Sequence, residues 1–421
     1  MCGLSTVAYA IDEARRATAL AMIEKSISYL RSEQDNATGG WSHNPRGPNL
    51  PAITGLVLTS MLLDPDFDRN DPVVRRGVEY LLTFRQPDGG IYDRILPSYN
   101  TAISVSALAL LDDDGDATRS DTVQAVIPPA VRFLKSLQFH EEAMPLGEAG
   151  AQSMRVDPSH PFYGGVGYGA SGRPDNSNLH FFLQALQDAG VPHDDPAVQR
   201  AIIFLSRTQM LDDTNDMPFA EGSSQGGFIY STSPDGEQLG LGESKAGEIK
   251  ETLDDGTVIS RLRAYGSMTY AGFKSFAYAR LSHDDPRVIA AFDWICRNYT
   301  LTENPGIGSD GQYYYYMLFG SAMNARGWSF DRSFRDDGIP VILPDDDIEE
   351  RDWANDLIDQ LATLQNDDGS FRSVDDRWME NNPVLITAYA TIAMQHAVRG
   401  RPARSDRPTD PALHHPDAAS K

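Results

Sequence analysis

One turn motif recurs six times along the chain, and this internal repeat limits the folds that the sequence can adopt. In each copy, the end of an apolar helical segment runs into a glutamine, then a glycine-bearing turn, then an aromatic or aliphatic residue. Gln34, Gln86 and Gln138 follow one another at intervals of 52 residues, and wider later gaps indicate loop insertions. The fifth copy has Tyr299 where the others have glutamine. The chain is therefore built from six similar units.

Each unit contains two helical segments of different character. The segment before the turn has a polar face, such as that of Arg207 in the fourth unit. The segment after the turn is apolar almost all round; Leu179, Phe182 and Leu186 of the third unit show the helical spacing. Because a helix that is apolar on every side is buried on every side, two concentric rings are indicated. We expect an all-α fold, an α6/α6 toroid of about twelve helices in six repeats.

The six turns, together with segments that follow them, resemble the prenyltransferase and squalene-cyclase repeat family, and most closely its bacterial single-toroid members. The segments that carry the likeness are 242–247, 264–275, 303–316 and 377–390. The resemblance implies a toroid with a central apolar cavity. Branches of that family cyclise terpenoids, attach prenyl groups to proteins, or bind covalently through a thioester.

The acid motif of the cyclase branch, Asp-x-Asp-Asp-Thr, falls on PDNSNL at 174–179 in this chain. Asp175 keeps the first acid, but Ser177 stands at the position of the proton-donating aspartate and Asn178 replaces the last one. A serine hydroxyl is not acidic enough to protonate an alkene, so the motif is disarmed at this position. We expect Asp175 and Asn178 mainly to cap the helix. Asp175 also remains a candidate acid, and Asn178 and His180 are candidate ligand contacts.

The residues that the other two branches need are missing. A prenyltransferase-like zinc site needs Asp, Cys and His at inner-helix starts, whereas Cys296 lies in a predicted outer helix. The thioester branch needs a Cys-Gly-Glu-Gln run, and the sequence has none. A phosphate-cradling glycine motif is also missing. We therefore predict no metal site and no cofactor.

Two other carboxyl groups lie at predicted inner-helix starts and are candidate catalytic acids. Asp310 precedes a run of tyrosines, and Glu380 precedes the last apolar segment. An apolar cavity mouth would raise the pKa of either carboxyl and allow it to act as a general acid. A purely structural role as a helix cap is the alternative for both.

Aromatic side chains on the same segments are candidate ligand contacts, namely Tyr265, Tyr270, Tyr313, Tyr316 and Trp378. Four successive tyrosines in a helix spread over about 300°, so only one or two of residues 313–316 can face a cavity. Aromatic faces stabilise carbocations by about 1–2 kcal/mol each, although these rings can equally fill the barrel.

Lys274 is one of only six lysines and lies inside a predicted inner helix, so it joins the candidate ligand contacts. If it is buried it needs a carboxylate partner or a lowered pKa. Pairing with Glu243, Asp310 or Glu380 is the hypothesis; a surface position for Lys274 is the alternative.

The net charge of −24 and pI of about 4.6 argue against nucleic acid and anionic membrane surfaces as partners. No segment has about 18 consecutive apolar residues, so no integral membrane segment is expected. The first residues lack the pattern of a signal peptide, which fits a cytoplasmic protein or an exported one whose signal has been removed. The sequence leaves this location and the oligomeric state open.

Residues 1–398 are predicted to form one toroid domain, and residues 399–421 a disordered tail with few apolar residues. The leading functional hypothesis is a squalene- or terpenoid-cyclase-like isomerase with an atypical acid site, acting on an apolar isoprenoid-like molecule. The alternatives are a non-catalytic toroid that binds a lipid, glycan or peptide, and a carbohydrate-active α/α barrel. The last would need two carboxylates about 5–9 Å apart across one cleft.

Overall fold

The computed structural model describes residues 11–41, 44, 46–68, 70–111, 121–142, 154–169, 172–252, 255–329 and 338–399. These residues form twelve α-helices and two short antiparallel hairpins, which confirms the all-α class. Arg399, placed in the predicted tail, is the last residue of a helix, and the rest of the tail lies outside the described residues.

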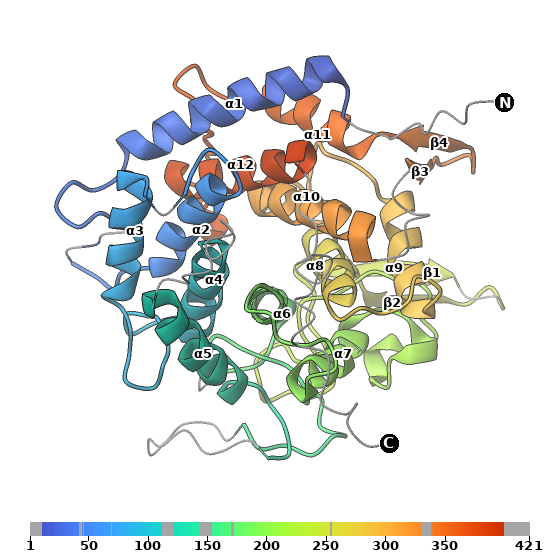
Figure 1. The fold of residues 1–421 in the computed structure, drawn as a ribbon. Helices are drawn as coiled ribbons and strands as arrows, with labels where there is room; N and C mark the ends of the chain where they lie inside the picture. Colours follow the sequence, from blue (N-terminus) through green and yellow to red (C-terminus); the bar gives the residue numbers. More distant parts are fainter. Residues whose placement is uncertain are drawn as a thin grey trace, which may run out of the picture.

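Six inner helices form a closed ring, with each helix packed on the next and the last packed on the first (Figure 1). They are α2 (Pro51–Leu62), α4 (Pro97–Leu110), α6 (Asn176–Asp188), α8 (Gly266–Tyr278), α10 (Gln312–Ser329) and α12 (Pro383–Arg399). In α4 and α8 almost every described residue is buried, as expected for a helix enclosed on all sides. The predicted toroid is confirmed.

Six outer helices surround this ring (Figure 1). They are α1 (Glu13–Ser32), α3 (Pro72–Leu82), α5 (Asp121–Ser136), α7 (Pro196–Thr208), α9 (Pro286–Arg297) and α11 (Trp353–Ala362). An Asp-Pro pair starts three of them: Asp71, Asp195 and Asp285 accept hydrogen bonds from first-turn N–H groups, and the proline takes the first helical position. Proline fits there because that N–H has no partner inside the helix.

The repeat glutamines join each unit to the next outer helix. The side-chain amide of Gln138 donates to Gly164 O in its own turn at 2.9 Å and to Ala197 O in α7 at 2.8 Å. Gln209 likewise donates to Gly226 O and to Arg287 O in α9, both at 2.8 Å. Gln34 does the same toward α3. We call this pair of hydrogen bonds the glutamine staple.

The degenerate fifth unit replaces the staple by another bond to the next outer helix. The hydroxyl of Tyr299 donates to Asp356 of α11 at 2.8 Å. Gln86 departs from the pattern, since its amide donates only to carbonyls of its own turn. Within the described part of the chain, the second unit therefore lacks a side-chain link of this kind to the next outer helix.

A glycine lets each turn approach the neighbouring helix closely. Gly164 has φ 83°, and a Cβ atom there would lie 1.8 Å from Arg200 O in α7. Any other side chain would require the turn or the helix to move. The glycine of the repeat thus allows the close approach of turn and helix across which the glutamine donates its two hydrogen bonds.

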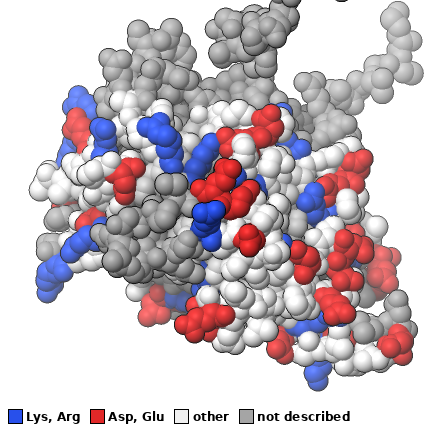
Figure 2. Space-filling view, turned by 90° about the horizontal axis from the view of Figure 1, so that it is seen from below, with Lys and Arg blue, Asp and Glu red and all other residues white. Residues whose placement is uncertain are grey.

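Insertions between the units form the two hairpins. The first pairs β1 (Glu248–Thr252) with β2 (Val258–Leu262), and the second pairs β3 (Ile339–Ile342) with β4 (Ile348–Arg351). Strand β3 packs against the outer helix α9. No described helix is long and apolar enough to cross a membrane. Figure 2 shows one face of the molecule, where basic side chains lie among more numerous acidic ones.

Replacing Gln138 by alanine removes two donated bonds and leaves the buried carbonyls of Gly164 and Ala197 without this donor. We expect Gln138→Ala to lower the free energy of unfolding by about 3 kcal/mol, because each buried unsatisfied group costs about 1–3 kcal/mol. Gln86→Ala is the matched control and should cost about 1 kcal/mol, since Gln86 bonds only within its own turn. Urea denaturation followed by circular dichroism measures both; equal losses would contradict a link between units.

Candidate functional site

The inner barrel holds an aromatic cavity of about 200 Å³ at the end where the six inner helices begin. Six tyrosines and one tryptophan line it, with aliphatic residues between them. The aromatic residues are Tyr99, Tyr168, Tyr230, Tyr265, Tyr314, Trp378 and Tyr389. Such a lining suits an apolar ligand of small size.

Backbone strain concentrates at this cavity. Leu96, Trp378 and Met379 have φ of 50°, 54° and 66°, and all three line the cavity. A side chain in this left-handed region costs of order 1 kcal/mol or more and persists where the surroundings impose it. The cavity is therefore held in shape at some expense to stability.

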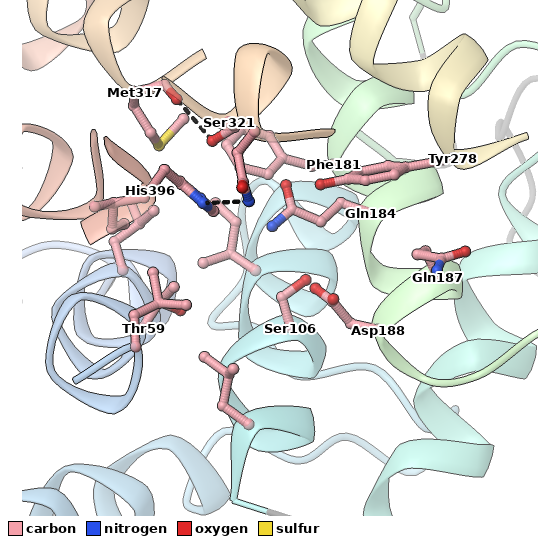
Figure 3. Close-up of a pocket in the computed structure, with 16 residues that line it drawn as sticks. Thr59, Ser106, Phe181, Gln184, Gln187, Asp188, Tyr278, Met317, Ser321 and His396 are labelled. Carbon is pink, nitrogen blue, oxygen red and sulfur yellow. Dashed lines mark hydrogen bonds between the residues drawn. The ribbon is translucent and has the colours of Figure 1, made fainter. Parts of the chain in front are cut away.

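A second, polar pocket of about 50 Å³ lies toward the other end of the inner helices (Figure 3). Gln184 reaches it from α6, Ser106 from α4 and His396 from α12. Leu56 and Ile103 line both spaces, so few side chains separate the aromatic cavity from the polar pocket.

Asp175 is the N-cap of α6, which is the structural role that its position predicted. Its carboxylate accepts a hydrogen bond from Asn178 N and another from the Asn178 side chain, both at 2.9 Å. Burial raises the pKa of Asp175 to about 6, against these hydrogen bonds, which lower it. Asp175 and Asn178 are buried and neither lines the aromatic cavity. A catalytic role for Asp175 and a ligand contact for Asn178 remain untested predictions.

Ser177 lines the cavity at the position of the missing acid and belongs to a chain of hydroxyl groups. Its oxygen lies 3.0 Å from the Tyr99 hydroxyl and 2.9 Å from the Tyr314 hydroxyl. The Tyr314 hydroxyl in turn lies 2.6 Å from His180 Nε2. The predicted contact residue His180 is therefore buried behind Tyr314 rather than facing the cavity.

Lys274 is fully buried, so its alternative surface position is wrong. Its ammonium group lies 3.2 Å from His180 Nδ1 and 3.0 Å from Gln184 Oε1, both on α6. The predicted pairing with Glu243, Asp310 or Glu380 is also wrong, because Lys274 lies near the middle of the barrel and these acids lie at its mouth. Burial lowers the pKa of Lys274 to about 7.

Glu380 is buried and adjoins the cavity in sequence, but it does not itself line the aromatic cavity. It follows Trp378 and Met379, and its side chain accepts a hydrogen bond from Tyr314 N at 2.8 Å. Glu380 therefore caps α10, not the helix that it precedes. Its second oxygen, Oε2, has no hydrogen-bond partner among the described residues. Burial raises the pKa of Glu380 to about 7, against the backbone N–H groups of Tyr314, Tyr313 and Gln312, which lower it.

Asp310 lies at the rim in an ion pair with Arg377, and its side chain is 30% exposed. The guanidinium group of Arg377 also lies over the Trp378 ring, 4.4 Å from its centroid. Asp310 does not line the cavity, and the ion pair holds its carboxylate beside a cation. The position of Asp310 fits a structural role in the ion pair with Arg377, and no contact with the cavity supports a role as acid catalyst.

Two of the five predicted aromatic contacts, Tyr265 and Trp378, line the cavity. Tyr270, Tyr313 and Tyr316 do not, and this corrects the prediction. Tyr270 packs between α8 and α10, while Tyr313 and Tyr316 donate to loop carbonyls outside the ring. Of the four successive tyrosines only Tyr314 lines the cavity. This agrees with helical geometry, which lets only one or two of them face the same side.

Sequence reasoning missed several residues that line the cavity, and two of these lie in loops. Tyr168 and Tyr230 come from repeat turns, and their hydroxyl groups lie 2.9 Å apart. Tyr99 lies in the first turn of α4, and this position at an inner-helix start was a signal that could have found it. Within the described part of the chain, no group of three or more His, Cys, Asp or Glu side chains is placed to hold a metal ion.

No protein-family model matches the sequence, and no curated protein matches it. Solved structures are similar in fold. An unsaturated glucuronyl hydrolase specific for heparin has 10% identity over 90% of this chain and 97% of its own, with a TM-score of 0.54. An inactive variant of an α-1,6-mannanase of Salegentibacter has 9% identity over 90% and 98%, with a TM-score of 0.51.

The type II terpene cyclase MstE from Scytonema has 14% identity over 91% of this chain and 98% of its own, with a TM-score of 0.47. At such identities, the similarity of the hydrolase and the mannanase shows the α/α toroid fold alone. The fold that the repeats predicted is thus confirmed, and a fold by itself does not determine the chemistry of its site.

We expect the stability of the protein to depend on the charge of Glu380. Its folded-state pKa of about 7 exceeds the ordinary value of 4.5, so the stabilisation is present at low pH and is lost as the pH rises through 7. Glu380→Gln keeps an acceptor for Tyr314 N but cannot ionise. Relative to the wild type it should gain about 2–3 kcal/mol between about pH 5 and about pH 8. Thermal denaturation at the two pH values measures this, and an unchanged difference would show that Glu380 ionises at its ordinary pKa.

Proposed function

We propose that the aromatic cavity binds an apolar, isoprenoid-like small molecule. The observation that carries this proposal is the lining, in which six tyrosines and a tryptophan join aliphatic side chains around about 200 Å³. A pocket lined by aromatic and aliphatic carbon, with few polar groups, gains its binding energy from the apolar surface of the ligand.

We propose further that the protein isomerises this molecule in a terpenoid-cyclase-like reaction, with Glu380 as the proton donor. Three features support Glu380: it is buried, its Oε2 has no partner among the described residues, and it adjoins cavity-lining Met379. A pKa of about 7 lets the carboxyl group hold its proton near neutral pH. The tyrosine rings around the cavity would stabilise a carbocation by about 1–2 kcal/mol each.

The strength of this acid limits the substrate. A carboxyl group with a pKa of about 7 is a weak donor, and an isolated alkene is a poor acceptor. An epoxide or an allylic alcohol accepts a proton on oxygen far more readily. We therefore propose an isoprenoid that carries such an oxygen atom as the substrate.

Binding without turnover is the second candidate function, and Ser177 favours it. This residue occupies the position where the cyclase motif has its acid, and its hydroxyl is held by Tyr99 and Tyr314. The third candidate, carbohydrate chemistry, has less support, although the hydrolase and the mannanase are named for sugar substrates. Glycoside hydrolysis needs two carboxyl groups, whereas no aspartate or glutamate is among the described residues that line the aromatic cavity, and Glu380 only adjoins that lining at Met379.

A larger side chain in the cavity should weaken ligand binding. Ala52 lines the cavity in the first turn of α2, and only its backbone N–H makes a hydrogen bond there, to Asn100. We expect Ala52→Phe to weaken binding of geranylgeraniol at least about tenfold, which corresponds to 1.4 kcal/mol, while the protein stays folded. Quenching of Trp378 fluorescence measures the binding, and Trp378→Phe identifies its signal. Equal affinity of the wild type and Ala52→Phe would place the ligand elsewhere.

If Glu380 is the acid, Glu380→Gln should reduce product formation from an epoxidised or hydroxylated polyprene by at least about a hundredfold, the contribution typical of a general acid. Asp310→Asn is the matched control at the rim, and we expect it to retain most of the activity. Gas chromatography with mass spectrometry measures the products. Turnover by Glu380→Gln at the wild-type rate would remove Glu380 from the mechanism.

A further inference from the structure

A continuous chain of hydrogen-bonding groups runs from the aromatic cavity into the centre of the barrel. It passes from Tyr99 and Ser177 through the Tyr314 hydroxyl to His180, and from His180 to Lys274, with no separation above 3.2 Å. Tyr99, Ser177 and Tyr314 line the cavity, whereas His180 and Lys274 are completely buried. The three helices α6, α8 and α10 supply the inner part of this chain. A lysine buried in this way needs a physical reason.

The surroundings of Lys274 favour its neutral amine. Its hydrogen-bond partners among the described residues are the neutral side chains His180 and Gln184 of α6. The Tyr278 ring lies 5.7 Å away on its own helix, and Asp188 is the acid whose charge favours the ammonium form. Burial outweighs that charge and lowers the pKa of Lys274 to about 7. Lys274 can therefore change its charge near neutral pH.

The charge of Lys274 fixes the tautomer of His180. An ammonium group has three donors and no acceptor, so next to it Nδ1 must accept and Nε2 must carry the proton. A neutral amine has a free lone pair, so Nδ1 can then donate to it, and Nε2 accepts from the Tyr314 hydroxyl. Burial and the nearby Lys274 hold the pKa of His180 well below its usual value. The imidazole therefore passes a proton by exchanging tautomers without becoming a cation.

We propose that Tyr314, His180 and Lys274 form a proton relay that takes a proton from the molecule held in the aromatic cavity. The Tyr314 oxygen accepts a proton from a carbon beside the cationic centre, and the C–H electron pair becomes the new C=C bond. Tyr314 passes its own proton to His180 Nε2, and the Nδ1 proton moves to Lys274, which becomes an ammonium group. One proton leaves the ligand and one is gained at Lys274, so charge and electrons balance. This inference rests on the proposed function and assigns its base.

Tyr314 is the one member of the relay that touches the ligand, so it is the catalytic residue, and His180 and Lys274 act through it. The proton can leave at the far end, because Gln184 joins Lys274 to the polar pocket that Asp188 also lines (Figure 3). Glu380, the proposed proton donor, lies at the start of α10 beside Tyr314, whereas the proton that leaves the ligand ends at Lys274, deeper in the ring.

The test is a pair of NMR titrations of the whole protein, from about pH 5 to about pH 11, without any substrate. Lysine Cε labelling gives only six signals, and ¹⁵N-histidine labelling gives two ring signals for each of nine residues, so single residues can be followed. We expect Lys274 to titrate near pH 7 and His180 to change from the Nε2–H to the Nδ1–H tautomer at the same midpoint. A bond with only a structural role would leave the tautomer unchanged.

Lys274→Met assigns the lysine signal and should leave His180 in one tautomer throughout, because the titrating partner is gone. Should that variant fail to fold, arginine at the five other lysine positions assigns Lys274 by exclusion. Lys250 on β1 serves as the internal reference, since its side chain is exposed. The relay is overturned if Lys274 titrates together with the other lysines, or if His180 keeps one tautomer across the Lys274 midpoint. Failure of the proposed function would instead appear as a lack of geranylgeraniol quenching of Trp378.

Discussion

The link between one repeat and the next outer helix is the interaction on which the ring depends. A buried glutamine donates two hydrogen bonds, one to its own turn and one to the next unit, and a glycine lets the two backbones meet. Each bond contributes only about 1 kcal/mol, but leaving its buried carbonyls unpaired costs more. The staple therefore works chiefly by excluding other arrangements of the units. The six units close on themselves, although the second lacks the staple and the fifth replaces it by the bond from Tyr299 to Asp356.

In the closed ring the starts of the six inner helices lie at one end, and the candidate site is at that end. Helix starts expose N–H groups that need acceptors, so buried polar groups collect there even around an apolar cavity. Asp175 and Glu380 each satisfy one of these starts. The difference between them is that Asp175 accepts from Asn178 with both oxygens, whereas Glu380 retains an oxygen without a partner among the described residues. The same requirement thus places a buried carboxyl group at each of two inner-helix starts, and the two groups differ in how many of their oxygens are hydrogen-bonded.

The sequence predicted the fold well because the repeat is local and its period is visible. Capping by Asp175 was predictable for the same reason, since a cap is a contact within a few residues. The partners of Lys274 were not, because His180 lies 94 residues away and only the ring brings α6 and α8 together. Helical periodicity limited how many of the four successive tyrosines could face inward but could not identify Tyr314, because the rotation of α10 is set by its neighbours. Glu380 was found by position, yet it caps a different helix from the one expected.

The last staple has a consequence for how the chain folds. Gln365 donates to Met22 O in α1 at 2.8 Å, a contact that spans 343 residues of sequence. The sixth unit therefore completes the ring against the first, which leaves the ribosome long before it. Until the sixth unit is made, the apolar surfaces of α1 and α2 that pack against α12 stay uncovered. Contacts of such long sequence separation form slowly. The nascent chain therefore exposes apolar helix surface until late in synthesis, and the closed ring buries it.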